Sequence, residues 1–590
     1  MKSEEFFANL QGFNTKYLEA LNLIMKKKIE DKNEFNPFND LLGMQNAYLQ
    51  AVTDFTNNPA KFFQHNLEYA SKVSNLMFHF MEKIHNDEKI DSLYNSSPRD
   101  KRFKDQAWQD SMYFNFVKQF YLMSCQWHRS LVGKLEVDAS KKKILEFYTE
   151  HILNAASPTN FINLNPEVIN ELVETNGQNL IQGIENFIED LKKSEQIPFI
   201  TTASEKVFEV GKNIAASEGK VIYENELAQL IHYKPKKNQV YSIPIFIVPP
   251  WINKYYILDL SKDNSFINYL LESGFQVFLI SWVNPDSSLS HKGFDDYMKQ
   301  GIIDPIRFLQ QKFNIKEFNL IGYCLGGTLS ACVNAYLTEQ ENPFKSTTYL
   351  TTLLDFSQPG DLGLFINKET IEAIKDQIQK RGYFSGKYMS YAFSLLRSNE
   401  LIWSFVVNNY LLGKKPIAFD LLYWNSDNTN LPAKMHSFYL ENMYVENNLI
   451  RKDGIKLLDR NIDLSKISRP SFFLSTKEDH IAPWEATYMS AKKLSSNKIS
   501  DCTFCLAASG HIAGVVNPPQ NKKYSYWVNT SIPQTSDKWF EDAKQHKGSW
   551  WDYWIKWIET RSGKKTEPLE YENIEYIEKA PGRYVKKRID

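Results

Sequence analysis

The sequence predicts an α/β fold, in which helices cover a parallel β-sheet, preceded by a mainly helical domain. Two changes of pattern along the 590 residues carry this prediction. In residues 1–200 apolar side chains recur at three- and four-residue spacing, which is typical of amphipathic helices, and strand signals are few. From residue 201 short apolar runs alternate with helical stretches, the pattern of βαβ units around a buried sheet. We therefore expect two domains, at 1–200 and 201–590.

Six short runs rich in β-branched and aromatic residues are predicted to be strands of this sheet. They are residues 240–251, 275–283, 318–324, 347–356, 470–479 and 501–511. More than a hundred residues separate the fourth run from the fifth, whereas an ordinary connection in such a sheet has ~2–6 residues. The intervening segment is rich in aromatic residues, and its apolar residues recur at helical spacing. We therefore expect an inserted cap at about 357–450 over the carboxyl edge of the sheet.

Composition and charge argue against several classes of function. A net charge of −1 provides no global field for binding nucleic acid. The longest apolar stretches are far shorter than the ~18 residues of a membrane-spanning helix. The first residues lack the basic and apolar segments of a secretion signal, and five cysteines do not suggest a disulfide framework. We therefore expect a cytoplasmic protein with free thiols, no transmembrane segment and no nucleic-acid partner.

The segment Gly322-Tyr323-Cys324-Leu325-Gly326 joins a predicted strand to a predicted helix. Glycines two residues before and two after a central nucleophile are typical of a strained turn that presents the nucleophile above a sheet. In such a turn the N–H of the next residue, here Leu325, faces the reacting oxygen, and the helix N-terminus stabilises a thiolate. The pattern predicts that Cys324 is a nucleophile; the alternative is an inert buried cysteine at the end of a strand.

An acid and then a histidine are expected later in the chain, each after a late strand of the sheet. Asp479 and His511 end the last two predicted strands, in that order. We therefore predict a triad of Cys324, His511 and Asp479 on an α/β-hydrolase fold with an inserted cap. His480 is the rival base, but adjacent residues rarely hold the geometry that orients an imidazole.

The remaining cysteines are not expected to carry chemistry. Cys332 falls inside the helix after the turn and is predicted to pack in the core. Cys502 and Cys505 form a lone C-x-x-C within a predicted strand, without the second pair of ligands that a zinc site needs. No metal site is therefore expected.

The second donor to a reacting oxygen usually comes from the loop after an early strand, which here follows the run 240–251. Pro249 and Pro250 have no N–H, so Trp251 or Ile252 would have to donate. We predict Trp251 as this donor. The alternative is a rigid loop that simply buries a tryptophan.

Eight segments of the chain resemble those of the polyhydroxyalkanoate synthases, which polymerise hydroxyacyl-CoA into storage polyester. They are "GKNIAASEGKVIYENELAQLIHY", "VPPWINKYYILDL", "SWVNPD", "GYCLGGTL", "LLYWNSDNTNLP", "KEDHIAPW", "SGHIAGVVNPP" and "GSWWDYWIKWI". The resemblance covers the chain from about residue 100 onward, and it implies that Cys324, Asp479 and His511 are catalytic. A second family aspartate falls on Asp286, with a supporting or unassigned role. Trp251 departs from the pattern, because some members have a smaller residue there.

The activity that the resemblance implies is acyl transfer: polymerisation of (R)-3-hydroxyacyl-CoA through an acyl thioester on Cys324. The length and the helical N-terminal domain resemble the single-subunit class that prefers short chains, so 3-hydroxybutyryl-CoA is the expected substrate. A thiol suits this chemistry, because exchanging one thioester for another keeps the acyl group activated until a hydroxyl attacks it. Two alternatives remain: a thioesterase or polyester hydrolase with the same triad, and a granule protein without activity.

The resemblance implies no cofactor, since the coenzyme A thioester is itself the substrate. The expected partners are this substrate, the growing polyester chain and a second copy of the protein in a homodimer. The expected location is the surface of polyester granules in the cytoplasm. The N-terminal helices either dock onto the granule or its coating proteins, or pack on the catalytic domain and help it to dimerise.

Overall fold

The computed structural model describes most of the chain in two units. The described residues are 3–30, 41–86, 90–98, 100–194, 199–204, 207–337, 341–366, 368–495, 501–533 and 535–589. The contacts group Met1–Thr202 with Tyr391–Ile417, and Ala203–Ser390 with Ala418–Asp590. Residues 391–417 of the expected cap belong to the helical unit rather than to the α/β unit.

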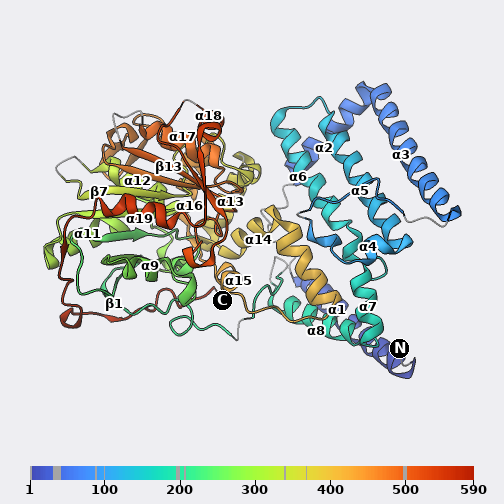
Figure 1. The fold of residues 1–590 in the computed structure, drawn as a ribbon, viewed down its shortest axis with the longest axis horizontal. Coiled ribbons are helices and arrows are strands. Elements are labelled where there is room, and N and C mark those ends of the chain that lie inside the picture. The colour runs from blue at the N-terminus through green and yellow to red at the C-terminus, as the bar shows by residue number, and fades with distance from the viewer. Residues whose placement is uncertain are drawn as a thin grey trace. The chain divides into compact units, whose positions relative to one another are not determined.

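The described residues of the first unit form helices joined by loops (Figure 1). Apolar faces pair these helices through small clusters; in one, Ala20 meets Ile184 and Ile188. No described helix of the chain combines the length and hydropathy that crossing a membrane requires. The main helices are α1 (Ser3–Glu30), α2 (Leu41–Asn57), α3 (Pro59–His85), α4 (Ala107–Asp110), α5 (Met112–Gly133), α6 (Ala139–Ala155), α7 (Pro166–Glu174) and α8 (Gln178–Lys193).

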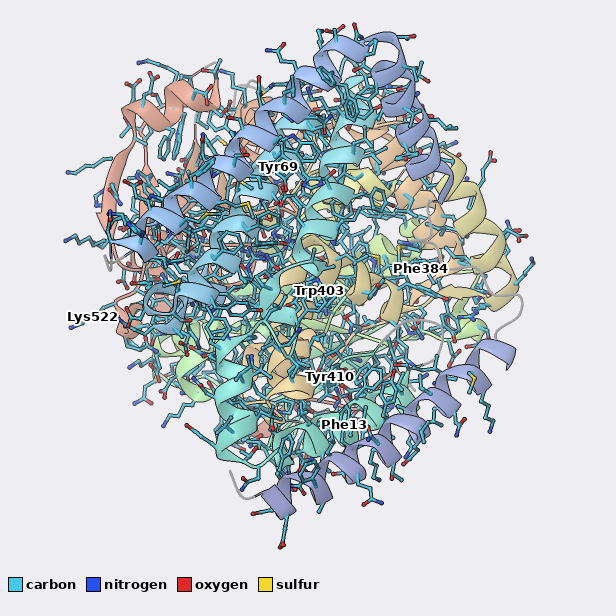
Figure 2. All side chains as sticks on the ribbon, turned by 90° about the vertical axis from the view of Figure 1, so that its right-hand side faces the viewer. Phe13, Tyr69, Phe384, Trp403, Tyr410 and Lys522 are labelled. Carbon is cyan, nitrogen blue, oxygen red and sulfur yellow. The ribbon has the colours of Figure 1, made fainter. Side chains whose placement is uncertain are left out.

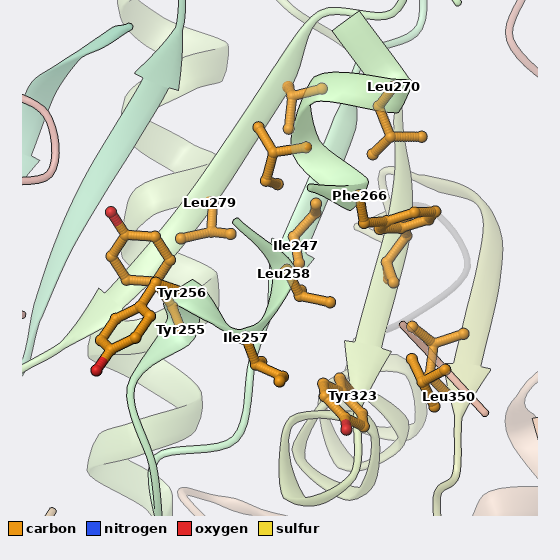
Figure 3. Packing of buried hydrophobic residues seen from close by; sticks show 14 of the residues in the cluster. Ile247, Tyr255, Tyr256, Ile257, Leu258, Phe266, Leu270, Leu279, Tyr323 and Leu350 are labelled. Carbon is orange, nitrogen blue, oxygen red and sulfur yellow. The ribbon is translucent and has the colours of Figure 1, made fainter. Parts of the chain in front are cut away.

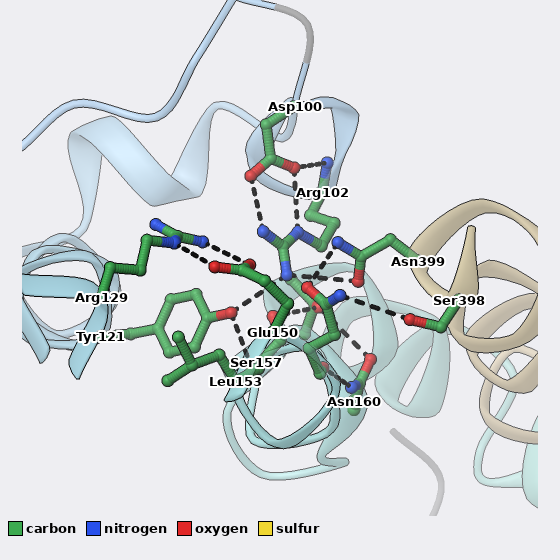
Figure 4. Close-up of polar contacts among 12 residues, drawn as sticks. Asp100, Arg102, Tyr121, Arg129, Glu150, Leu153, Ser157, Asn160, Ser398 and Asn399 are labelled. Atoms are coloured by element: carbon green, nitrogen blue, oxygen red, sulfur yellow. Dashed lines mark hydrogen bonds and ion pairs between the residues drawn. The ribbon is translucent and has the colours of Figure 1, made fainter. Parts of the chain in front are cut away.

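Polar contacts fix residues 391–417 within the helical unit. The Asn399 amide donates to Asn154 Oδ1 at 2.7 Å, and its oxygen accepts from Arg102 Nη1 at 3.4 Å (Figure 4). Tyr410, labelled in Figure 2, donates its hydroxyl to Asp190 Oδ2 at 2.6 Å. Helical spacing alone predicts that this segment is helical but not which core it joins, and these long-range bonds decide that question.

The second unit is built on a sheet whose central strands are parallel and whose edges are antiparallel. The six predicted runs overlap the parallel strands β4, β5, β6, β7, β12 and β13, so the predicted fold class is confirmed. The antiparallel edge strands were not predicted. In spatial order the strands are β15 (Lys544–Lys547), β14 (Ser525–Val528), β13 (Cys502–Ala507), β12 (Ser471–Thr476), β7 (Phe344–Leu350), β6 (Phe318–Tyr323), β4 (Ile245–Val248), β5 (Val277–Trp282), β2 (Ala228–Tyr233), β1 (Gly219–Glu224) and β17 (Glu578–Lys579).

Helices pack against this sheet through its alternate side chains. On one face Ile247 and Leu279 join a large buried cluster with Phe266 of α9 (Figure 3). Trp551 and Trp554 of α19 complete this cluster, which explains the tryptophan-rich stretch of the sequence. The helices with residues in this unit are α9 (Phe266–Glu272), α10 (Phe294–Met298), α11 (Asp304–Phe313), α12 (Leu325–Tyr336), α13 (Lys368–Arg381), α14 (Gly386–Leu396), α15 (Asp420–Asn425), α16 (Ala433–Tyr439), α17 (Trp484–Ser495), α18 (Ser536–Asp542) and α19 (Trp551–Glu559).

Candidate active site

Cys324 occupies a strained turn between β6 and α12. Its backbone has φ 51° and ψ −117°. Residues other than glycine rarely adopt this conformation, which costs about 1–3 kcal/mol. The flanking glycines permit the turn: a Cβ on Gly322 would lie 2.4 Å from Gly327 Cα, and one on Gly326 would lie 2.1 Å from the Val248 carbonyl oxygen. Both glycines are therefore required by close backbone approach, as the sequence pattern predicts.

Asp479 and His511 meet although 32 residues separate them in the chain. His511 Nδ1 lies 2.7 Å from Asp479 Oδ2, and both side chains are nearly or wholly buried. The other carboxylate oxygen, Oδ1, accepts from the backbone N–H groups of Ile481 and Ala482 at 2.9 Å each. These bonds hold Asp479 as an oriented carboxylate, which leaves His511 Nε2 available for a proton from a second group.

The Cys324 sulfur lies close enough to His511 to alter its titration. Burial lowers the pKa of His511, but the Asp479 carboxylate and the Cys324 sulfur outweigh it through charge and hydrogen bonding and raise that pKa to about 10. Tyr323 stacks its ring 5.9 Å from the imidazole and donates its hydroxyl to the His511 carbonyl at 3.3 Å. The structure thus brings the three predicted residues together. Tyr323 was not predicted; its place inside the turn is the only sequence signal for it.

The rival residues have other surroundings. The Asp479 carboxylate binds His511, and the backbone carbonyl of the adjacent His480 accepts the Asp361 N–H at 3.1 Å. Burial raises the pKa of the Cys332 and Cys505 thiols, and it raises the pKa of Cys502 to about 12. These thiols are therefore poor nucleophiles. The described residues contain no cluster of histidine, cysteine and carboxylate side chains that could hold a metal ion.

The two predicted oxyanion donors have different surroundings. Leu325 is the first residue of α12, where backbone N–H groups lack a helical acceptor. Trp251 is 2% exposed, and its ring lies 5.0 Å from Tyr297 and about 6 Å from Trp282 and Phe294, as measured between ring centroids. The indole is therefore part of an aromatic core, as the alternative reading expects. Donation by the Trp251 backbone N–H stays a prediction.

Asp286 lies at the surface and takes part in a different set of contacts. Its carboxylate accepts from the Ser288 hydroxyl at 2.5 Å and from Lys587 Nζ at 3.0 Å. The hydrogen bonds from Ser288 and Lys587 lower the pKa of Asp286 to about 2. These contacts make Asp286 the N-cap of a short helical turn and an anchor for residues near 587. Its supporting role in catalysis stays a prediction.

Aromatic residues of the expected cap lie near the thiol. Tyr439 ends α16, and Tyr444 follows in the next helical turn; their ring centroids are 5.6 Å apart. Phe356 contacts both rings, at 6.1 and 5.2 Å. Burial raises the pKa of both tyrosines, and the Cys324 sulfur adds to the rise. The sequence indicates an aromatic cap here but does not single out these two side chains.

Comparison with known proteins identifies the family. The model described as "Poly-beta-hydroxybutyrate polymerase (PhaC) N-terminus" matches residues 99–270, and that for the "alpha/beta hydrolase fold" matches residues 254–518.

Three curated relatives are similar over most of their length. The "Poly(3-hydroxyalkanoate) polymerase subunit PhaC" of Rhizobium meliloti is 39% identical, with 85% of this chain and 81% of that protein covered. The protein of the same name from Cupriavidus necator is 39% identical, with 82% and 83% covered. "Poly(3-hydroxyalkanoate) polymerase 2" of Ectopseudomonas oleovorans is 38% identical, with 84% and 88% covered. The resemblance seen in the sequence is confirmed: the chain belongs to the poly(3-hydroxyalkanoate) polymerase family.

Proposed function

We propose that the protein polymerises (R)-3-hydroxyacyl-CoA, with 3-hydroxybutyryl-CoA as the preferred substrate, into polyester and releases coenzyme A. One observation carries this proposal beyond family membership. The 2.7 Å contact between His511 and Asp479 lies beside Cys324 in a strained turn, an arrangement suited to nucleophilic catalysis. Cys324 is the proposed nucleophile, His511 the proposed base and Asp479 the residue that orients the base.

Before the first step the Cys324 thiol has passed its proton to His511, and the resulting thiolate attacks the thioester carbonyl. The electron pair of that carbonyl moves to oxygen and is stabilised by the Leu325 N–H and a donor in the loop after β4. Each such donor contributes roughly 3 kcal/mol in comparable sites. When the tetrahedral intermediate collapses, the bond to the coenzyme A sulfur breaks. His511 returns its proton to that sulfur, so acyl-Cys324 and free coenzyme A remain.

In the second step a 3-hydroxyl group, of the chain or of a new monomer, attacks acyl-Cys324. His511 accepts the hydroxyl proton, an oxoester forms, and the carbon–sulfur bond breaks. The proton then passes from His511 to the sulfur, which restores the free thiol. Because a thioester is more activated than an oxoester, this step runs downhill, whereas an oxoester on serine would leave little driving force for elongation.

Water competes with the hydroxyl for acyl-Cys324, so the site has to exclude it. Tyr439, Tyr444 and Phe356 form an aromatic layer near the thiol that suits this task. We infer that this layer moves aside when substrate enters. The same proposal includes a homodimer at the surface of polyester granules, with the N-terminal helices as the docking or dimerising element.

The test is to supply purified protein with 3-hydroxybutyryl-CoA and to measure free coenzyme A and insoluble polymer in the same reaction. Release of coenzyme A together with polymer is expected. Release without polymer would assign the triad to a thioesterase or polyester hydrolase instead. Absence of release from hydroxyacyl-CoA of four to eight carbons would favour a granule protein without activity.

A further inference from the structure

Residues 583–589 run in a fixed path across the α/β unit. Arg583 forms ion pairs with Glu224 and with Glu578, the latter at 3.0 Å. Val585 is 1% exposed and joins the large apolar cluster of the sheet. This stretch looks like a solvated basic end in the sequence, yet the structure holds it by both charge and apolar burial. The residues that follow Val585 are thereby placed beside α15 (Figure 1).

A buried polar network begins where this segment passes the loop after β4. Lys254 is 3% exposed, and its Nζ donates to the Lys587 carbonyl at 2.7 Å. Asp427, from the segment after α15, accepts the Tyr256 hydroxyl at 2.8 Å, and Arg588 Nε lies 3.8 Å from its other oxygen. Burial lowers the pKa of Lys254 to about 8, while the Asp427 carboxylate opposes that fall. None of the catalytic steps above uses this buried ammonium.

The position of Lys254 connects this network to the nucleophile turn. Lys254 is the last residue of the 249–254 loop, whose first carbonyl oxygen would lie 2.8 Å from a Cβ on Gly326. In the middle of this loop the Ile252 carbonyl accepts the Thr429 N–H at 3.2 Å. One end of the loop thus lies against β4 and the turn. At the other end the Lys254 carbonyl accepts from Trp424 Nε1 at 2.7 Å, and the Lys254 ammonium adds its bond to the Lys587 carbonyl. This is the loop that we predict to supply the second oxyanion donor.

We propose that Lys254 is a positioning residue. Its ammonium, which donates to the Lys587 carbonyl, fixes the 249–254 loop so that a loop N–H meets the oxyanion formed when Cys324 attacks the thioester. This role rests on the proposed function. A shift of about 1 Å in a reacting group can cost about 10²-fold in rate. A buried ammonium is costly to keep, and holding this loop gives a reason for it. The Lys587 carbonyl supports the ammonium directly, and Arg588, through Asp427 and Tyr423, holds this end of the segment in place.

The test compares two reactions of the same thiol. Acylation of Cys324 by 3-hydroxybutyryl-CoA forms an oxyanion, whereas alkylation by iodoacetamide displaces iodide at carbon and forms none. In Lys254→Met, single-turnover release of coenzyme A should fall about 10- to 100-fold, with alkylation within about twofold of the wild type and KM little changed. Lys586→Gln, an exposed neighbour in the same segment, should leave both rates unchanged.

Other results overturn the role of Lys254. Unchanged acylation in Lys254→Met would show that the loop needs no anchor, and a parallel loss of both rates would show a general structural role. If this variant does not fold, Arg588→Gln carries the test, because that side chain is 38% exposed; a smaller loss of acylation alone is expected. A wild-type protein that is alkylated but releases no coenzyme A rejects the proposed function itself, and with it this role.

Discussion

The two units bury their apolar side chains in different ways. In the α/β unit one large cluster extends from Ile247 on the sheet to Trp554 on α19, both fully buried. In the helical unit the described residues form several small clusters, and α3 leaves Phe63 65% exposed and Phe78 69% exposed. The comparison teaches that the proposed nucleophile lies on the continuously packed unit, whose large apolar cluster includes Tyr323 and packs against Cys324. The helical unit leaves large apolar side chains of α3 exposed.

The largest expected effect tests whether the α/β unit carries the chemistry at all. Cys324→Ala should reduce coenzyme A release by about 10⁴-fold or more, because the nucleophile is lost. The melting temperature should stay close to that of the wild type, since only one partly exposed sulfur is removed. Cys332→Ala is the matched control and should retain most activity. Loss of activity in the control but not in Cys324→Ala would move the nucleophile to the helix.

The next largest loss of activity tests which histidine acts as the base. His511→Gln should lower coenzyme A release by about 10³-fold or more, because the proposed base is removed. His480→Gln, one residue from the orienting carboxylate, should cost less than about tenfold. Steady-state rates with 3-hydroxybutyryl-CoA measure both. Equal damage from the two changes would contradict His511 as the base.

The charge of Asp479 should set the pH range in which His511 stays protonated. Negative charge on Asp479 raises the pKa of His511 against the opposing effect of burial. In Asp479→Asn that pKa should fall, so the imidazole loses its proton at lower pH than in the wild type. Activity should drop by about 10²- to 10⁴-fold, and alkylation of Cys324 at pH 7 should slow. A pH profile of iodoacetamide alkylation that does not change would contradict this coupling.

Stability measurements address the packing difference directly. Phe266→Ala removes a buried ring that contacts Trp551 and Trp554, and it should lower the free energy of unfolding of the α/β unit by about 3–5 kcal/mol. Phe78→Ala on the exposed face of α3 should change stability by less than about 0.5 kcal/mol. Urea unfolding, followed by circular dichroism and by hydrogen exchange of each unit, measures the loss of stability in each of the two variants. A similar loss from both changes would mean that the α3 face is covered.

A more local effect is expected for residues 391–417, which belong to the helical unit although the sequence placed them in the cap. Asn399→Ala removes the hydrogen bonds to Asn154 and Arg102, and it should cost about 1 kcal/mol. Hydrogen exchange in residues 399–411 should become faster, while exchange in β6 stays the same. Asn408→Ala, whose amide bonds only within its own helix, is the matched control. Faster exchange in β6 as well would show that the segment also stabilises the sheet.

The local sequence was enough to predict much of the fold and the proposed triad. The parallel strands are continuous apolar runs because both faces of the sheet are buried, and this leaves a signal in each run. The turn at Cys324 needs glycines on both sides because backbone atoms approach closely there, and that requirement is local. The placement of Asp479 and His511 after late strands follows from the order of the strands along the chain.

Other features depended on which distant segments meet. The sequence showed that residues 391–417 are helical, yet only tertiary contacts assign them to the helical unit. The sequence assigned Asp286 no definite role, and only the tertiary structure shows that its carboxylate pairs with Lys587. The link from Lys254 to Lys587 joins a backbone carbonyl to a side chain 333 residues away. A repeating pattern of apolar residues shows which face of a helix or strand is buried, but it does not show which distant segment packs against that face. The sequence by itself therefore determined the scaffold and pointed to the proposed triad, while the tertiary structure decided which distant segments lie around it.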